Sequence, residues 1–153
     1  MLLYAASFEL KVHWLAKHTL FWFPMGWVMR LLGGVPVNRR ARQNLVQAMS
    51  DCFTERDSFV LVVPAEGSRD YTDYWKSGFY QIARSANVPI LPSFLDYRRK
   101  LGGFAAPIVP SGDIARDMDY LRSVYQPMRG LRPGQFGPVR LREEHGSGGG
   151  LSE

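Results

Sequence analysis

A group of polar and charged residues follows a short apolar run near the middle of the chain. The run covers residues 59–63, and Glu66, Gly67, Ser68 and Arg69 come soon after it. Glycine lets a backbone approach a ligand closely, and the planar guanidinium of arginine offers donors that suit a phosphate. Buried strands in α/β domains often deliver such loops to one edge of a sheet. The pattern predicts an anion site, and it is equally compatible with a surface turn that carries a Glu66–Arg69 ion pair.

Three short blocks of the sequence resemble those of the glycerolipid acyltransferases, the lysophosphatidate acyltransferase family. Residues 64–69, Pro-Ala-Glu-Gly-Ser-Arg, resemble the Pro-Glu-Gly-Thr-Arg block of that family. Residues 34–39 resemble its upstream Gly-x-x-x-x-Arg block, and residues 88–92 resemble its Val-Pro-Ile-x-Pro block. The order and spacing of the blocks also agree, and the resemblance covers about residues 11–143. A set of three blocks in order is a specific signal, whereas any one of them is weak.

The resemblance implies a binding site for the phosphate of a lysophospholipid acceptor such as 1-acylglycerol 3-phosphate. The residues that it assigns to this site are Arg39, Glu66, Gly67, Ser68, Arg69 and Lys76. Ser68 replaces the threonine of the family, and its hydroxyl can still donate a hydrogen bond. Two or three cations around one phosphate are electrostatically sound, especially in a partly dry pocket.

The resemblance also implies an acyl transfer that uses a histidine as the base. In the family this histidine deprotonates the acceptor hydroxyl, which attacks the thioester of acyl-CoA or acyl-carrier protein, and an aspartate five residues later orients the base. The histidines of this chain are His13, His18 and His145, and none has an aspartate at that spacing. The sequence therefore offers no catalytic residue. We expect that the part of the fold with this pair is missing ahead of Met1, through a mis-called start, a gene fragment or a natural pseudoenzyme.

Composition limits the other classes of function. The chain has 153 residues, a net charge of +5 and a pI near 9.6, which favours an acidic partner. A single cysteine, Cys52, excludes an internal disulfide, and no zinc spacing, phosphate-loop motif or Gly-x-Ser-x-Gly motif occurs. We expect no metal and no cofactor beyond the acyl donor as co-substrate. A basic nucleic-acid-binding module is the main unrelated alternative, because residues 39–42 and 98–100 are rich in arginine and lysine.

The relation of the chain to a membrane rests on one aromatic stretch. The most apolar run, residues 20–29, is much shorter than the roughly 20 residues that a spanning helix needs. Within it, Trp22, Phe23 and Trp27 suit either a membrane interface or a core helix packed on the sheet. We expect a cytoplasmic protein that associates peripherally with a membrane.

Alternating apolar patterns predict the fold. Strands are expected over residues 12–16, 35–37, 59–63 and 89–97, with residues 59–63 as the central strand. A glycine turn with a short return strand is expected over 101–110. Helices are expected over residues 24–32, 41–54, 76–86 and 113–128, and either Asp113 or Ser111 should cap the last of them. This alternation predicts a single layered α/β domain with a mixed, largely parallel sheet flanked by helices. The domain should cover residues 1–142, and residues 143–153 should form a flexible tail.

Overall fold

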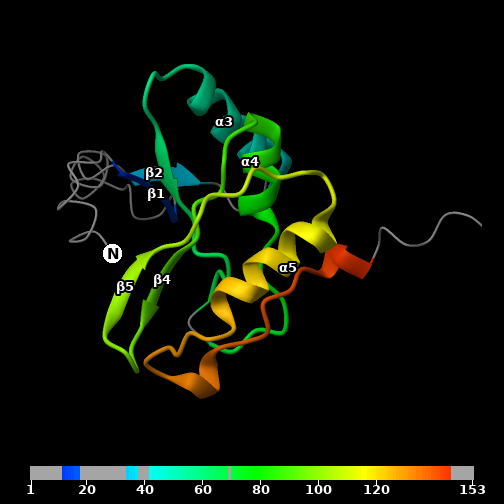
Figure 1. The fold of residues 1–153 in the computed structure, drawn as a ribbon. Helices are drawn as coiled ribbons and strands as arrows, with labels where there is room; N and C mark the ends of the chain where they lie inside the picture. The colour runs from blue at the N-terminus through cyan, green and yellow to red at the C-terminus, as the bar shows by residue number, and fades with distance from the viewer. Residues whose placement is uncertain (1–11, 18–33, 38–41, 69, 146–153) are drawn as a thin grey trace, which may run out of the picture. The chain divides into compact units, whose positions relative to one another are not determined.

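The computed structural model of the chain describes residues 12–17, 34–37, 42–68 and 70–145. Its contacts group the chain into two compact units, Met1–Val63 and Pro64–Glu153, and each unit is described here by itself. Helices and strands alternate along both units (Figure 1). The predicted mixed α/β class is therefore confirmed, while the arrangement as one layered, largely parallel sheet stays a prediction.

The first unit contains a small sheet. Its strands are β1 (Val12–Lys17), β2 (Gly34–Val37) and β3 (Val60–Val62), which pair in the order β2-β1-β3. Both pairs are parallel, with Leu15 opposite Val35 and His13 opposite Leu61. Three of the predicted strands are thus present, but the strand predicted as central, β3, lies beside β1 at one end of this order.

The predicted amphipathic helix of the first unit is α3 (Arg42–Thr54). Met49 is buried on it, and Phe53 packs edge-to-face against Phe59 with ring centroids 4.8 Å apart. Cys52 is a free cysteine that is only partly buried. Apolar spacing along the helix therefore marked its inner face correctly, as expected for a 3.6-residue period.

The second unit begins where β3 ends. It contains α4 (Gly78–Ala86), β4 (Ser93–Asp96), β5 (Leu101–Phe104) and α5 (Ile114–Tyr125). Two short 3₁₀ helices follow, η2 (Pro133–Gln135) and η3 (Arg142–His145). Of the two predicted caps, Asp113 is the one that caps α5, since its side chain accepts a hydrogen bond from the backbone N–H of Arg116 at 3.1 Å.

The strand predicted over residues 89–97 is shorter than expected. Only Ser93–Asp96 forms a ladder strand, and Ile90 makes an isolated antiparallel bridge with Ile108. Pro89 and Pro92 lack the backbone N–H groups that a continuous ladder needs.

The glycine turn predicted within residues 101–110 was misplaced. The turn comes earlier, at residues 97–100, where Lys100 has a φ of 54°. Gly102 and Gly103 lie inside β5, which pairs antiparallel with β4. An added Cβ at Gly103 would lie 3.3 Å from Cζ of Phe94, so the ring of Phe94 lies over this glycine.

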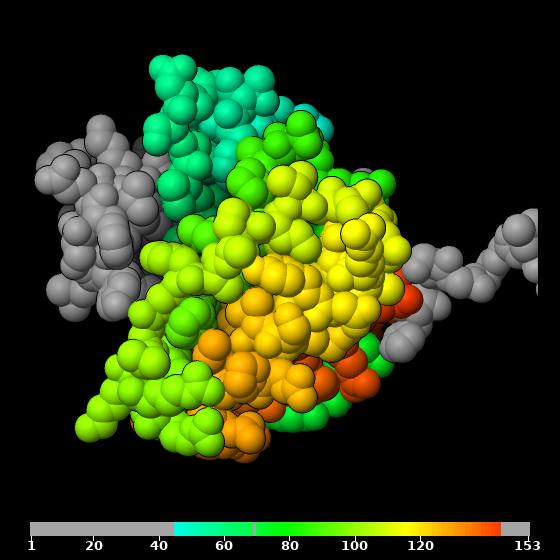
Figure 2. Space-filling view, in the orientation of Figure 1, coloured from blue at the N-terminus to red at the C-terminus, as the bar shows by residue number. Residues whose placement is uncertain are grey.

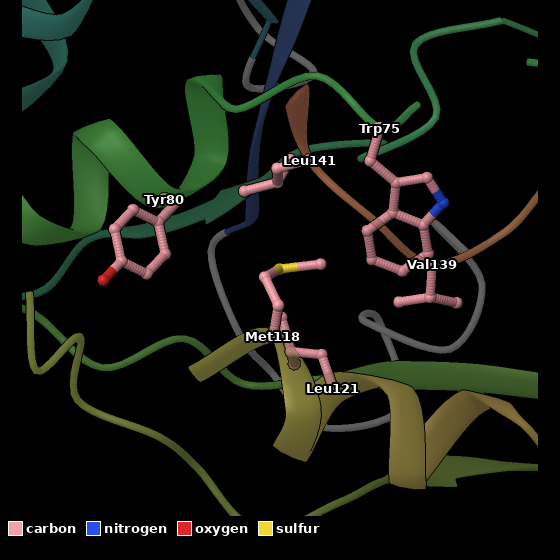
Figure 3. Close-up of a cluster of buried hydrophobic side chains, with 6 residues drawn as sticks. All are labelled: Trp75, Tyr80, Met118, Leu121, Val139 and Leu141. Carbon is pink, nitrogen blue, oxygen red and sulfur yellow. The ribbon is translucent and has the colours of Figure 1, made fainter. Parts of the chain in front are cut away.

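One hydrophobic cluster holds the second unit together. Six buried side chains from α4, α5 and the loops meet in it: Trp75, Tyr80, Met118, Leu121, Val139 and Leu141 (Figure 3). The indole of Trp75 also packs edge-to-face against Tyr125, with centroids 5.4 Å apart. Segments separated by more than 60 residues, such as those around Trp75 and Leu141, thus share a core.

Several predicted elements lie outside the described residues. These are the helix over 24–32, the aromatic stretch over 20–29 and residues 146–153 of the tail predicted over 143–153, whose first residues belong to η3. Within the described ranges, no helix is both long and apolar enough to cross a membrane.

Candidate functional site

A tight turn directly follows β3. The backbone N–H of Gly67 donates to the carbonyl of Pro64 at 3.1 Å, and Gly67 has a φ of 65°. Residues with a side chain rarely adopt this left-handed conformation, so the turn explains why glycine stands at this position. The turn leaves Gly67 and Ser68 exposed to solvent.

Lys76 lies against this turn. Its backbone N–H donates to the carbonyl of Ala65 at 2.7 Å. A Cβ added to Gly67 would lie only 2.9 Å from Cγ of Lys76, so the lysine stem covers the place that a larger side chain would need. The structure therefore brings together Gly67 and Lys76, two residues that the sequence assigned to one anion site.

The other predicted site residues differ in what the structure says of them. The hydroxyl of Ser68 accepts a hydrogen bond from the backbone N–H of Asp70 at 3.1 Å, which leaves its own proton available to a ligand. Arg39 and Arg69 lie outside the described residues, so their convergence on one phosphate stays a prediction.

Glu66 is the one acidic member of the predicted site. Its side chain is partly buried, and its Oε1 atom has no hydrogen-bond partner among the described residues. Burial raises the pKa of this carboxyl group above its ordinary value. An acceptor without a partner among the described residues can still take a hydrogen bond from a further donor.

Changing Glu66 to glutamine should raise the free energy of unfolding at pH 7 by about 0.5 kcal/mol, because the neutral amide avoids the cost of partly burying a charged carboxylate. The expected gain is small because the side chain is only partly buried and water screens its charge. The folded chain binds the proton of Glu66 more tightly than the unfolded chain does. The stability contributed by the neutral carboxyl is therefore present at acidic pH and lost as the pH rises through the raised pKa. Denaturant unfolding at pH 3 and pH 7 measures this, and the variant's advantage should vanish at pH 3.

The exposed Glu55 supplies the matched control, and its change to glutamine should have no such effect. The same experiment tests whether Glu66 forms an ion pair with Arg69 in the folded chain. A Glu66→Gln variant that is less stable than the parent at pH 7 would favour a structural Glu66–Arg69 ion pair.

The segment before α4 is held by residues from much later in the chain. The backbone N–H of Trp75 donates to the carbonyl of Arg140 at 2.8 Å, and Nε of Arg140 donates to the carbonyl of Asp73 at 2.8 Å. The hydroxyl of Ser77 donates to Oε1 of Glu143 at 2.6 Å. Residues 140–143 thus hold the loop that carries Lys76 in place. No local sequence pattern could have revealed these contacts.

A buried polar network joins α4 to α5. The hydroxyl of Tyr80 donates to Oδ2 of Asp117 at 2.8 Å, and both side chains are almost fully buried. The backbone N–H and the hydroxyl of Ser111 also donate to this carboxylate, at 2.7 and 2.8 Å. Burial, followed by the bond to Asp117, raises the pKa of Tyr80 to about 12.

Sequence reasoning missed this network, although one signal was available. Asp117 lies between Ile114 and Leu121 on the inward face of α5, three and four residues from them. A carboxylate at an inward helical position needs buried donors, so it predicts a polar network even when its partners are unknown. Among the described residues, no group of three or more His, Cys, Asp or Glu side chains could hold a metal ion.

The fold and the turn together indicate the class of this protein. This mixed α/β protein has a glycine turn that follows a strand in the sequence, and a lysine whose stem lies against the turn. A model of the acyltransferase family matches residues 1–96, and the chain belongs to this family. Its members transfer acyl groups between a donor and an acceptor in lipid metabolism. No match was found among curated proteins or among solved structures.

Proposed function

We propose that this chain binds the phosphate of a lysophospholipid, such as 1-acylglycerol 3-phosphate, as the acceptor of an acyl group. The donor is acyl-CoA or acyl-carrier protein, and the place of action is the cytoplasmic face of a membrane. The observation that carries the proposal is the contact between the stem of Lys76 and Gly67, in a turn exposed to solvent. Membership of the acyltransferase family supports acyl transfer as the reaction.

Each residue of the turn has a distinct task in this proposal. Gly67 gives the turn its shape through its positive φ, and the Ser68 hydroxyl donates to the phosphate. The ammonium group of Lys76 supplies a point charge, while Arg69 supplies a planar set of donors. Glu66, whose Oε1 atom lacks a partner among the described residues, accepts from Arg69 or from a hydroxyl of the acceptor.

Arg39 completes the site in this proposal as a second guanidinium on the same phosphate. Two arginines and a lysine around one dianion give short, charge-assisted hydrogen bonds. The proposal assigns acceptor binding to these residues and proton removal to none of them, because no His-x-x-x-x-Asp spacing occurs in the sequence. That same observation favours a second candidate function, which is binding of a phosphate-bearing lipid without acyl transfer.

Replacing either Arg69 or Arg39 with alanine should weaken the binding of lysophosphatidate by roughly 1–3 kcal/mol, because each substitution removes charge-assisted hydrogen bonds. Titration calorimetry with a short-chain, water-soluble lysophosphatidate measures this below its micelle concentration. Because both arginines are assigned to one phosphate, the double variant should lose less than the sum of the single losses.

An Arg116→Ala variant serves as the control, since this arginine is exposed on α5 and outside the proposed site. Its affinity for lysophosphatidate should match that of the parent chain. Unchanged affinity in both the Arg39 and the Arg69 variants would remove the assignment of a shared phosphate.

A further inference from the structure

Strands β4 and β5 form an antiparallel hairpin whose surface is unusually apolar. We call residues 93–104 the basic hairpin, because its turn also carries Arg98, Arg99 and Lys100. Four of its large side chains have exposed fractions between 47% and 54%. They are Leu95, Tyr97, Leu101 and Phe104. Exposed apolar side chains that cluster in this way usually mark a surface that contacts a partner.

The apolar side chains lie on both faces of the hairpin. Leu95 is directly opposite Gly102, and Phe104 is two residues further along the same strand, so Leu95 and Phe104 share one face. Leu101 is opposite Asp96 and lies on the other face. A partner that covers all of these side chains must therefore reach both sides of the hairpin.

The turn of the basic hairpin carries three consecutive cations, Arg98, Arg99 and Lys100, all exposed. Asp96 is buried and accepts from the backbone N–H groups of Arg98 and Arg99 at 3.0 and 3.3 Å, which fixes the turn. Its Oδ2 atom also lies 3.3 Å from Nε of Arg99. Arg98 and Lys100 form no ion pair with any described residue, so their charges remain available.

A second segment of the same unit extends this surface. The backbone N–H of Tyr97 donates to the carbonyl of Arg129 at 2.8 Å, which places residues 129–132 beside the turn. This segment adds Arg129, Arg132 and the side chain of Leu131, which is 67% exposed. In Figure 2 the hairpin stands out at the lower left, next to the orange atoms of this region. The sequence has no aspartate or glutamate in residues 97–112 or 126–140.

We propose that the basic hairpin and residues 129–132 dock on the surface of a bilayer that contains anionic phospholipid. The cations meet the lipid phosphates, and the apolar side chains enter the boundary between head groups and acyl chains. A fluid lipid layer can surround a projecting turn and contact both of its faces. A folded acidic protein would cover one face and leave Leu95 or Leu101 in water. This inference deepens the proposed function, since it names the surface through which the chain reaches its lipid acceptor.

Sedimentation with vesicles tests the proposal. The full chain should bind vesicles of phosphatidylcholine and phosphatidylglycerol, with about one anionic lipid in three, much better than vesicles of phosphatidylcholine alone. An Arg98→Gln/Lys100→Gln double variant should lose binding by roughly 25-fold, at about fivefold for each cation removed. Leu101→Asn should lose it by roughly tenfold, because the leucine no longer enters the lipid.

The matched control removes two cations elsewhere in the same unit. An Arg116→Gln/Arg142→Gln double variant should bind the vesicles within about twofold of the parent chain, because these exposed arginines lie outside the docking surface. Equal binding to neutral and anionic vesicles would overturn the proposal. So would equal losses in the hairpin variant and the control, or binding of a single-stranded oligonucleotide with none of vesicles.

The same variants keep this inference separate from the proposed function. Their affinity for soluble, short-chain lysophosphatidate should equal that of the parent, because the hairpin does not belong to the proposed phosphate site. Vesicle binding that is absent, while Arg69→Ala still weakens lysophosphatidate binding, would remove the hairpin inference alone.

Discussion

Replacing Gly137 with alanine should lower the free energy of unfolding by about 3 kcal/mol, near the upper end of the usual cost of overpacking. A Cβ at this position would lie 1.9 Å from the carbonyl oxygen of Thr72 and 3.1 Å from its carbonyl carbon. The obstacle is backbone, so no rotation of a side chain can relieve the contact. Denaturant unfolding followed by circular dichroism measures the loss.

Gly134 provides the control for this substitution. It lies three residues earlier, and a Cβ added there would meet nothing within 4 Å. Gly134→Ala should therefore leave the free energy of unfolding within about 0.5 kcal/mol of the parent value. Similar losses in the two variants would mean that residues 72 and 137 do not approach each other as described.

Replacing Asp117 with alanine should cost about 4 kcal/mol of unfolding free energy, because the change leaves buried donors without an acceptor. The carboxylate accepts from the Tyr80 hydroxyl and from two groups of Ser111, at 2.7–2.8 Å. It also lies in the first turn of α5, where a negative charge is favourable. The loss is measured by denaturant unfolding at pH 7.

Two further variants locate the origin of this loss. Asp119→Ala, on the exposed side of α5, removes an ion pair with Arg122 and should cost less than about 1 kcal/mol. Tyr80→Phe should cost about 2 kcal/mol in the parent and much less in the Asp117→Ala chain, because the two groups share one hydrogen bond. Additive losses would show that Tyr80 and Asp117 do not interact.

The sequence predicted those helices and caps that depend on residues only a few positions apart. The apolar spacing of α3 and α5 and the cap at Asp113 follow from local rules, and the structure has them. The start of the helix predicted over residues 76–86 was wrong by two residues. Helix α4 begins at Gly78, and Lys76 lies in the segment before it, where its backbone N–H donates to the carbonyl of Ala65.

Long-range pairs were beyond the reach of such rules. The bond between Trp75 and Arg140 and the close approach of Thr72 to Gly137 join segments with no shared periodicity. Of the predicted phosphate site, the sequence identified the residues of the turn, and the structure supplied the contact between Gly67 and Lys76. The roles of Arg39, Glu66, Ser68 and Arg69 toward a phosphate stay predictions.

The support that residues 140–143 give to the Lys76 segment has a consequence for biosynthesis. Glu143 is translated 66 residues after Ser77, the residue whose hydroxyl it binds. At roughly 5–20 residues per second, the ribosome needs several seconds to make the intervening chain. During that interval residues 73–77 lack their hydrogen bonds to residues 140–143, so the geometry that these bonds stabilise forms only after residues 140–143 have emerged.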